Sequence, residues 1–535
     1  MARSILLRLV QSLAGRTRPA PGSAEAEVAA SKRRRAAARR AAEREARRDL
    51  LLRGIAVAAT TALPASRPAQ GAADRSVKVA VVGGGLAGLA AAWRLAQAGV
   101  NVTVFEAAPR VGGRCWTERR AFDGGQVAER GGELIDSAHD EIIDLALALG
   151  LVLDDLHAAT SRGTRPVWWI DGRRYEESQA VRDFARLWPA LAADARLLGD
   201  DTPTFSRHTS AQRTLDHTSA AQWLDSRVPG GLASPLARLL GNAYTEELGA
   251  DLAEISAVTV VDLLRDSPRD RVSPYEESDQ RYHVRGGNDL LVQCMAEGLA
   301  GRIETGTRLV AVVRRGDGRY RLAFARDQAT REAEFDQVVL AVPFTLLHDV
   351  DLAQAGFRTR KLQAIRELGM GRNTKLQLQF DERAWIAGGG SGETRIEGSY
   401  QVSWEVSRGQ AGAQGILNFY SGGATATRAG EGSPEEQARK ALADAERIHP
   451  GLGARWNGRV IRNAWDRHPW SRGSYSLLKP GQYTALHGIE HLPEGRVHFA
   501  GEQSSAAWYG YLNGAVQSGL DAATAILRAS GQRVA

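Results

Sequence analysis

The clearest pattern of hydrophobic and polar positions lies near residue 80, where three short elements follow one another. Val77 to Val82 is a run of mostly β-branched apolar residues, which predicts a buried strand. Leu86 to Gln97 is rich in alanine and leucine and predicts a helix that ends at Gly99. Asn101 to Phe105 predicts a second short strand. Together they predict a βαβ unit of about thirty residues.

Three glycines join the first strand to the helix. Gly83, Gly85 and Gly88 have G-x-G-x-x-G spacing. The first permits a tight turn, the second lets the backbone approach a pyrophosphate, and the third lets the helix pack close to the sheet. Phosphate charge would then meet the free N–H groups of Leu86 and Ala87, the first helical residues.

An acidic residue follows the second strand at the distance that this fingerprint requires. Glu106 comes about twenty residues after the glycines and is expected to accept both hydroxyls of a ribose. Because strand, helix and acid are all in register, the stretch predicts a dinucleotide site. The unit does not by itself decide between FAD and NAD.

The rest of the chain alternates between sheet-like and helix-like patterns. Residues 178 to 270 have apolar spacings of three and four, which predicts a mostly helical block. A hairpin is expected around the Asp171-Gly172 turn. Further strands are predicted at 308–313, 320–325, 338–342, 374–380 and 416–420, and further helices at 140–149, 434–449 and 514–527. A helical block within an α/β chain indicates a second domain.

The basic charge of the chain comes from its first residues. The net charge is +7, but residues 1 to 53 hold 14 Lys and Arg against 5 Asp and Glu, which leaves about −2 for the remainder. We therefore expect a basic leader over residues 1–75 and no nucleic-acid-binding surface. Arg47-Arg48 resembles a bacterial twin-arginine signal, and a short apolar run follows it. Export, periplasmic or secreted, is the expectation; a basic tail in the cytoplasm or a mitochondrial-type presequence is the alternative.

Cysteine and hydropathy patterns exclude several other classes. The two cysteines, Cys115 and Cys294, make neither a disulfide framework nor a metal cluster, and the histidines show no metal-ligand spacing. After the leader no apolar run reaches 18 residues, so no stable membrane span is predicted.

Several motifs beyond the fingerprint occur in a family-specific order. The chain resembles the flavin-dependent amine oxidases, which include monoamine, polyamine and L-amino acid oxidases, over nearly all of residues 76 to 530. The motifs that carry the resemblance are Gly112-Gly113-Arg114, Gly131-Gly132, Gly286-Gly287, Ala341-Val342-Pro343, Phe499-Ala500-Gly501-Glu502 and Trp508-Tyr509-Gly510-Tyr511-Leu512-Asn513-Gly514-Ala515.

The resemblance implies an α/β fold with a Rossmann-like FAD-binding domain and an inserted α+β substrate domain. The FAD-binding domain would be assembled from residues 76–165, 280–345 and 455–535, and the substrate domain from 166–279 and 346–454. FAD is the implied cofactor. A small amine and O2 are the implied partners, and a dimer is plausible.

The resemblance also implies which residues hold FAD. Arg114 would lie at the flavin side of the pyrophosphate, where a guanidinium suits phosphate oxygens. Gly132, Glu133 and Gly501 belong to the same set. Glu502 would hold the ribityl or pyrophosphate region, and Val312 would meet the adenine through its backbone.

Three residues fall at the family's catalytic positions. Lys375 lies in an alternating strand, where the family has a lysine bonded through water to flavin N5; the alternative is an edge-strand lysine that faces water. Tyr475 and Tyr511 fall where the family has an aromatic cage that orients the amine. Trp465 and Trp508 are expected to belong to the same wall.

Two acids and one serine complete the expected site. Glu129 and Glu133 either face the cavity and hold a substrate ammonium, or pair with a nearby arginine such as Arg130. Some family members attach FAD through a cysteine just before the first cage tyrosine. Ser474 stands there in this chain, so non-covalent FAD is predicted.

The expected reaction is oxidation of an amine to an imine, with hydrolysis to an aldehyde or ketone and with O2 reduced to H2O2. An L-amino acid oxidase needs an arginine for the carboxylate. Leu134 and Ile135, not an arginine, follow Glu133, although Arg162 or Arg395 remain candidates. A desaturase or porphyrinogen-type oxidase and a non-catalytic FAD-binding protein are further alternatives.

Overall fold

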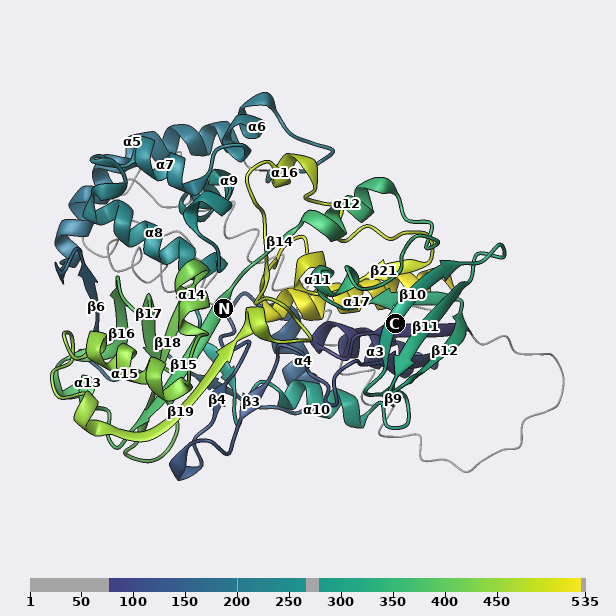
Figure 1. Cartoon of the computed structure of the whole chain (residues 1–535), viewed down its shortest axis with the longest axis horizontal. Helices are drawn as coiled ribbons and strands as arrows, with labels where there is room; N and C mark the ends of the chain where they lie inside the picture. Colours follow the sequence, from purple (N-terminus) through teal and green to yellow (C-terminus); the bar gives the residue numbers. More distant parts are fainter. Residues whose placement is uncertain (1–76, 200, 266–278, 531–535) are drawn as a thin grey trace, which may run out of the picture.

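The computed structural model describes residues 77–199, 201–265 and 279–530 (Figure 1). The leader and its twin-arginine-like signal lie outside these residues. Within the part that is described, no helix combines the length and apolar character needed to cross a bilayer.

A five-stranded parallel sheet forms the centre of the cofactor half, at the right of Figure 1. Both faces of this sheet are covered, which explains why its strands are continuous apolar runs. Val79 and Val81 pack against helices, whereas Ala80 and Val82 pack against a three-stranded antiparallel sheet. The parallel strands, in sheet order, are β21 (Val497–Phe499), β13 (Gln337–Leu340), β1 (Lys78–Val82), β2 (Asn101–Phe105) and β9 (Ile303–Glu304).

The covering layers come from distant parts of the chain. The three-stranded sheet consists of β10 (Arg308–Arg314), β11 (Tyr320–Arg326) and β12 (Ala329–Phe335). The helices on the other face are α3 (Leu86–Gln97), α4 (Asp140–Ala148), α10 (Leu290–Glu297) and α17 (Leu512–Ala529). Helix α3 has the predicted bounds, and Gly99 after it has φ 79°.

The substrate half is built on a seven-stranded mixed sheet. Its strands, in sheet order, are β19 (Trp456–Ala464), β15 (Asn373–Phe380), β18 (Gly415–Gly422), β17 (Val402–Glu405), β16 (Gly390–Ile396), β6 (Arg165–Ile170) and β7 (Arg173–Arg174). The predicted hairpin joins β6 to β7, and both turn residues, Asp171 and Gly172, have positive φ.

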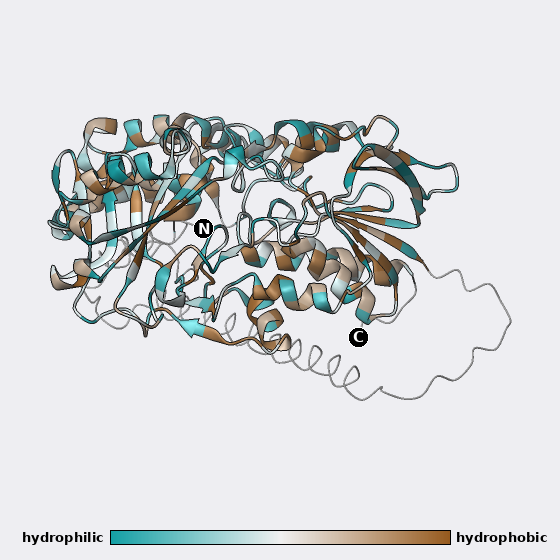
Figure 2. Cartoon of the chain, turned by 60° about the horizontal axis from the view of Figure 1, so that its bottom comes forward, coloured by the Kyte–Doolittle hydropathy of each residue, from teal (hydrophilic) through white to brown (hydrophobic). Residues whose placement is uncertain are grey.

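Helices surround this second sheet. The predicted helical block forms a separate apolar core from α5 (Glu177–Leu198), α6 (Ser210–Asp216), α7 (Ala220–Arg227), α8 (Pro235–Leu248) and α9 (Ala257–Leu264). One sheet face packs on α15 (Pro434–Ala445), beside α13 (Ala384–Ala387) and α14 (Gly423–Ala429). Figure 2 shows hydrophobic and hydrophilic residues on most helices, as expected when one side is buried and the other exposed.

Several short elements complete the fold. The helices among them are α11 (Phe344–Leu347), α12 (Thr359–Glu367) and α16 (Gln482–Ala485). The two-stranded pairs are β3 (Thr117–Glu118) with β4 (Ala128–Glu129), β5 (Leu153–Asp155) with β8 (Tyr282–Val284), and β14 (Gly369–Met370) with β20 (Ser476–Leu477).

The structure moves two of the expected domain boundaries. Strand β19 lies after residue 455, in the stretch expected for the cofactor domain, but it pairs with β15 in the substrate sheet. Leu347 to Ile365 lie in the stretch expected for the substrate domain, but their buried side chains pack in the cofactor core with Val82 and Phe105. Both expected boundaries differ from the structure because the composition of the sequence does not change where the chain crosses from one domain to the other.

Candidate functional site

A cavity of about 710 Å³ lies where the parallel strands end. Val82, Phe105, Ala341 and Gly501 line it, and each lies at or just after the carboxyl end of a parallel strand. Ligands of open α/β sheets bind at this edge. The volume and the position suit a dinucleotide.

The three fingerprint glycines have different local environments. A Cβ at Gly83, where φ is +105°, would lie 2.5 Å from Ala341 O, and a Cβ at Gly88 would lie 1.9 Å from Gly83 O. A Cβ at Gly85 would meet nothing within 4 Å, and Gly85 lines the cavity together with Leu86 and Ala87. The first and third therefore serve packing, whereas the second keeps the cavity open beside the helix N-terminus.

Glu106 is held in the cavity wall by the backbone. Its Oε2 accepts the Gly84 N–H at 2.6 Å and its Oε1 accepts the Ala108 N–H at 2.7 Å. Burial raises the pKa of this carboxyl, and the backbone hydrogen bonds oppose that shift. The carboxylate is thus oriented in advance for hydroxyl donors.

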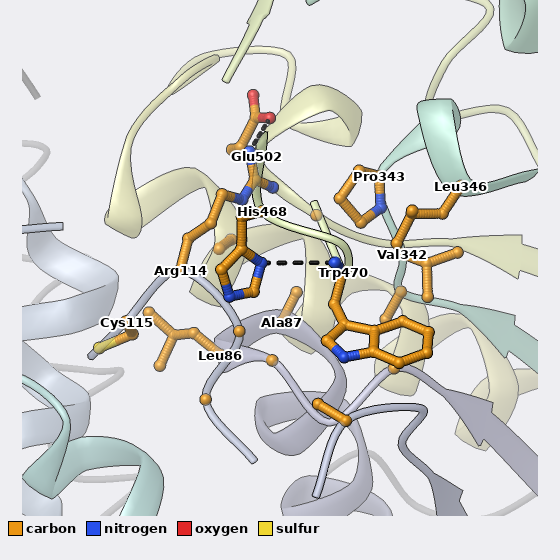
Figure 3. Close-up of a pocket in the computed structure, with 18 of the residues that line it drawn as sticks. Leu86, Ala87, Arg114, Cys115, Val342, Pro343, Leu346, His468, Trp470 and Glu502 are labelled. Atoms are coloured by element: carbon orange, nitrogen blue, oxygen red, sulfur yellow. Dashed lines mark hydrogen bonds and ion pairs between the residues drawn. The ribbon is translucent and has the colours of Figure 1, made fainter. Parts of the chain in front are cut away.

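An ion pair also lines the cavity. Arg114 Nη1 donates to Glu502 Oε1 at 3.0 Å and to Ser474 O at 2.7 Å (Figure 3). Glu502 also accepts the N–H of Gly510 at 3.1 Å and the N–H and hydroxyl of Ser476. Two residues 388 positions apart are therefore fixed against each other.

Gly132 and Gly501 also line the cavity. A Cβ at Gly132 would lie 2.4 Å from Leu512 Cδ2, so only glycine lets the loop approach helix α17. Gly501 has φ +133°, a conformation that other residues rarely adopt. Together with Gly85, Glu106 and Arg114, these residues form a cradle that fits FAD.

The expectation for Val312 is wrong in this structure. Its N–H donates to Asp351 O at 2.9 Å, its side chain is buried in the core between the two sheets, and it does not line the cavity. Thr307, Arg308 and Leu309, at the start of β10, line the cavity instead. The strand was predicted correctly, but its end and not its middle reaches the cavity.

Lys375 is fully enclosed rather than exposed. Strand β15 is an inner strand, and the side chain of Lys375 is 1% exposed. Its Nζ donates to Glu133 Oε2 at 2.5 Å and to Glu129 O at 3.1 Å. Glu133 lines the cavity and also accepts Trp404 Nε1–H at 2.8 Å. The lysine thus borders the cavity through Glu133.

The two acids have separate environments. Glu129 accepts the Thr117 hydroxyl and the Asn288 N–H, and His283 Nε2 lies 2.9 Å from its Oε1. The hydrogen bond and charge of Glu129 raise the pKa of His283 against the opposing effect of burial. Neither acid pairs with Arg130, which binds Glu118 at 2.5 Å.

Tyr475 and Tyr511 both line the cavity. The Tyr475 hydroxyl donates to Glu247 O and lies 3.3 Å from the Tyr420 hydroxyl. Trp465 and Trp508 do not line the cavity but pack behind it. Trp465 Nε1 donates to Arg130 O at 3.1 Å, and the Trp508 ring lies 6.1 Å from the Tyr511 ring.

Sequence reasoning missed several residues at this site. His139 lies edge-on to the rings of Trp508 and Tyr511, at 4.8 and 4.9 Å, and burial lowers its pKa to about 3. Cys115 and Trp470 line the cavity, as Figure 3 shows. Cys115 follows Arg114 directly, and Trp470 lies five residues before Tyr475. This nearness to predicted site residues is the sequence feature that could have identified them.

Known proteins are similar to this chain over most of its length. A family model described as flavin containing amine oxidoreductase matches residues 86–527. The flavin-dependent L-tryptophan oxidase of Lentzea aerocolonigenes is 28% identical over 490 residues, covering 85% of this chain and 99% of that protein. A putative flavin-containing monoamine oxidase of Mycobacterium tuberculosis is 28% identical over 470 residues, covering 84% and 96%.

Solved structures share the fold. Putrescine oxidase bound to putrescine has a TM-score of 0.70 at 24% identity and covers 84% of this chain and 99% of that one. Cyclohexylamine oxidase from Brevibacterium oxydans has a TM-score of 0.72 at 22% identity and covers 85% and 100%. The family model spans both halves of the chain, and the chain therefore belongs to the flavin containing amine oxidoreductase family.

Proposed function

We propose that this chain oxidises an amine to an imine, with FAD as the bound cofactor and O2 as the final electron acceptor. The observation that carries the proposal is that Tyr475 and Tyr511 line the same cavity as the dinucleotide fingerprint, with the Lys375–Glu133 pair at its border. When bound, FAD supplies the two-electron acceptor. The protein supplies orientation, exclusion of water and electrostatics.

Each residue has a defined part in this proposal. The faces of Tyr475 and Tyr511 hold the amine between them, since aromatic faces attract nitrogen groups with partial positive charge. The Glu133 carboxylate is the only acid on the cavity border that also contacts Lys375 among the described residues, and it interacts with the substrate nitrogen. The ammonium of Lys375 stabilises negative charge that develops nearby.

The substrate must lose a proton before its C–H bond is oxidised. The rate should therefore rise with pH through the pKa of the bound amine. Steady-state peroxide release between pH 6 and 9 measures this dependence. A flat profile over that range contradicts the proposal.

An L-amino acid oxidase is the second candidate, and the L-tryptophan oxidase relative supports it. The residue after Glu133 is Leu134, so the motif offers no guanidinium there. Arg162 is exposed, whereas Arg395 is buried. Peroxide release over a panel of monoamines, polyamines and L-amino acids separates these substrate classes. If no amine gives peroxide while FAD is bound, the result contradicts the main proposal and favours a desaturase-type or non-catalytic role.

We also propose that FAD is held without a covalent bond. Ser474 occupies the position before Tyr475, and its hydroxyl donates to Asn373 Oδ1 at 2.5 Å. Cys115 does line the cavity, but burial raises the pKa of its thiol well above the usual value, which disfavours the reactive thiolate. Acid precipitation of the holoenzyme should leave all flavin in the supernatant.

Export remains a proposal that rests on the leader sequence alone. Fractionation of the native host should find the enzyme outside the cytoplasm. Replacing Arg47 and Arg48 with Lys should retain it inside, because the twin-arginine route reads the arginine pair.

A further inference from the structure

Arg395 is a buried cation in the substrate half of the molecule. It lies on β16, and its side chain and that of Glu246 on α8 are both 0% exposed. Arg395 Nη1 donates to Glu246 Oε1 at 3.1 Å. Buried charges are costly unless they are paired and hydrogen-bonded, so the remaining donors of this guanidinium need an explanation.

The unused donors lie on one edge of the guanidinium. Nε and Nη2 of Arg395 have no hydrogen-bond partner, and neither has Glu246 Oε2. The Nε–Nη2 edge presents two parallel N–H groups, which is the geometry that binds a carboxylate bidentately. Glu246 therefore accepts a hydrogen bond from Nη1 of Arg395, and the Nε–Nη2 edge stays available.

The position of Arg395 relative to the cavity follows from the strand register. Lys375 pairs with Tyr420, Tyr420 with Val402, and Val402 with Arg395. The side chains of these four residues lie on one face of the sheet. Lys375 and Arg395, at the two ends of the row, are three strands apart. With about 4.8 Å between strands, the Cα atoms of Lys375 and Arg395 are roughly 14 Å apart.

This face carries apolar and polar side chains together, and it adjoins the cavity. Trp404 on the same face donates to the cavity residue Glu133, and Tyr420 contacts the hydroxyl of the cavity residue Tyr475. The side-chain nitrogen and oxygen of Asn418, two residues from Tyr420, are buried without a partner. The row thus begins at the cavity border and ends at Arg395.

Glu246 is the carboxylate that pairs with Arg395, and the pKa of this carboxyl is shifted. Burial raises the pKa of Glu246 to about 7 although Arg395 lowers it.

We propose that Arg395 binds a carboxylate carried by the substrate amine, several bonds away from the carbon that is oxidised. This inference rests on the proposed amine oxidation. In an α-amino acid the carboxylate and the nitrogen are attached to one carbon, whereas Tyr475 is connected to Arg395 only through Tyr420 and Val402. The substrate class is a straight-chain ω-amino carboxylate, with the amine between Tyr475 and Tyr511 and the acid on the Arg395 fork.

The first test measures binding without turnover. Hexanoate, which has no amine to oxidise, is titrated into the FAD holoenzyme by calorimetry. We expect saturable binding that weakens about 100-fold in Arg395→Met, because truncating one partner of a buried charge pair has effects of this size. Arg395→Lys keeps the charge but loses the fork, so an intermediate loss is expected. If Arg395→Met fails to fold, Arg395→Lys provides the test of binding instead.

The second test measures selectivity. Wild-type kcat/KM for 6-aminohexanoate should exceed that for hexylamine, and Arg395→Met should reduce this ratio about 100-fold. Arg383→Lys is the control for Arg395→Lys, because Arg383 lies beside the same sheet, just after β15, and all its nitrogens have partners. The control should leave the ratio unchanged.

The outcomes separate this inference from the proposed function. Oxidation of hexylamine without preference for the acid, and no hexanoate binding, overturns the carboxylate subsite but leaves amine oxidation standing. Hexanoate binding that depends on Arg395, with no amine oxidised, supports the subsite and overturns the proposed function. A preference for diamines that Glu246→Gln abolishes overturns the subsite in favour of a second ammonium on Glu246.

Discussion

The cofactor half and the substrate half of this molecule use different means to hold polar groups. Around the parallel sheet, the cavity is formed mainly by backbone: glycines, a helix N-terminus, and a carboxylate that two N–H groups orient. Around the seven-stranded sheet, charged side chains are buried on one face and pair across strands and helices. The first kind of site follows from local sequence, whereas the second depends on tertiary packing.

The ion pairs illustrate the difference. Arg114 and Glu502, at the cofactor cavity, are 20% and 6% exposed, so solvent shares in their stabilisation. Lys375 and Glu133 are 1% and 5% exposed, and each leaves an uncompensated buried charge if the other is removed. The substrate half should therefore be more sensitive to changes in charge, and the cofactor half to changes in backbone shape.

The largest effect is expected from Gly88→Val. A Cβ there overlaps Gly83 O at 1.9 Å, so helix α3 must move away from the sheet and the phosphate-binding turn must open. We expect loss of bound flavin absorbance and severe destabilisation in thermal unfolding.

Gly85→Ala is the matched control for shape. Its Cβ meets no protein atom but enters the cavity, so the apoprotein should unfold at the wild-type temperature. FAD affinity should fall about tenfold or more, equivalent to at least about 1.4 kcal/mol. Unchanged affinity would contradict the assignment of this cavity to FAD.

Lys375→Met should have the next largest effect. It leaves Glu133 buried without its cation, at a cost of about 3–5 kcal/mol, and turnover should fall about 100-fold. The double variant Lys375→Met/Glu133→Gln removes both charges and should recover stability but not turnover. Recovery of both would show that Lys375 has only a structural role.

Lys361 tests buried charge outside the site. It donates to the carbonyls of Ile489 and Glu490, and burial lowers its pKa to about 7. Because the folded state binds fewer protons than the unfolded state between pH 7 and 10.5, stability should rise with pH over that window.

Lys361→Met should remove this rise, with a difference on the order of several kcal/mol between its ends. Unfolding midpoints measured from pH 6.5 to 10.5 provide the readout. Lys440→Met, at an exposed position, should keep the wild-type slope. An equal slope in all three proteins would show that Lys361 stays charged throughout.

The smallest effect is expected from Tyr475→Phe. It loses the hydrogen bond to Glu247 O but keeps the aromatic face, so stability should fall by about 1 kcal/mol and turnover by only a few-fold. Tyr475→Ala removes the face and should raise KM and lower kcat further. Equal damage from both variants would show that the hydroxyl, and not the ring, acts in the reaction.

The sequence by itself determined the βαβ fingerprint of the cofactor half, and the family resemblance supplied Arg114 and Glu502. Helix α3 has its predicted bounds, and Gly85, Glu106, Arg114 and Glu502 all reach one cavity. For Gly85 and Glu106 the reason is that turns and short βαβ connections depend on neighbouring residues. Even here, Val312 was misplaced, because the strand pattern does not show which end of β10 meets the cavity.

Only the tertiary structure decided the substrate half. Alternation in β15 indicated that Lys375 and Leu376 face opposite sides, but not that Glu133, 242 positions away, covers the lysine. The same limit concealed the unused fork of Arg395 and the place of β19 in the sheet. A residue pattern records which face is polar, whereas the partner of a buried charge is fixed by packing between segments distant in sequence.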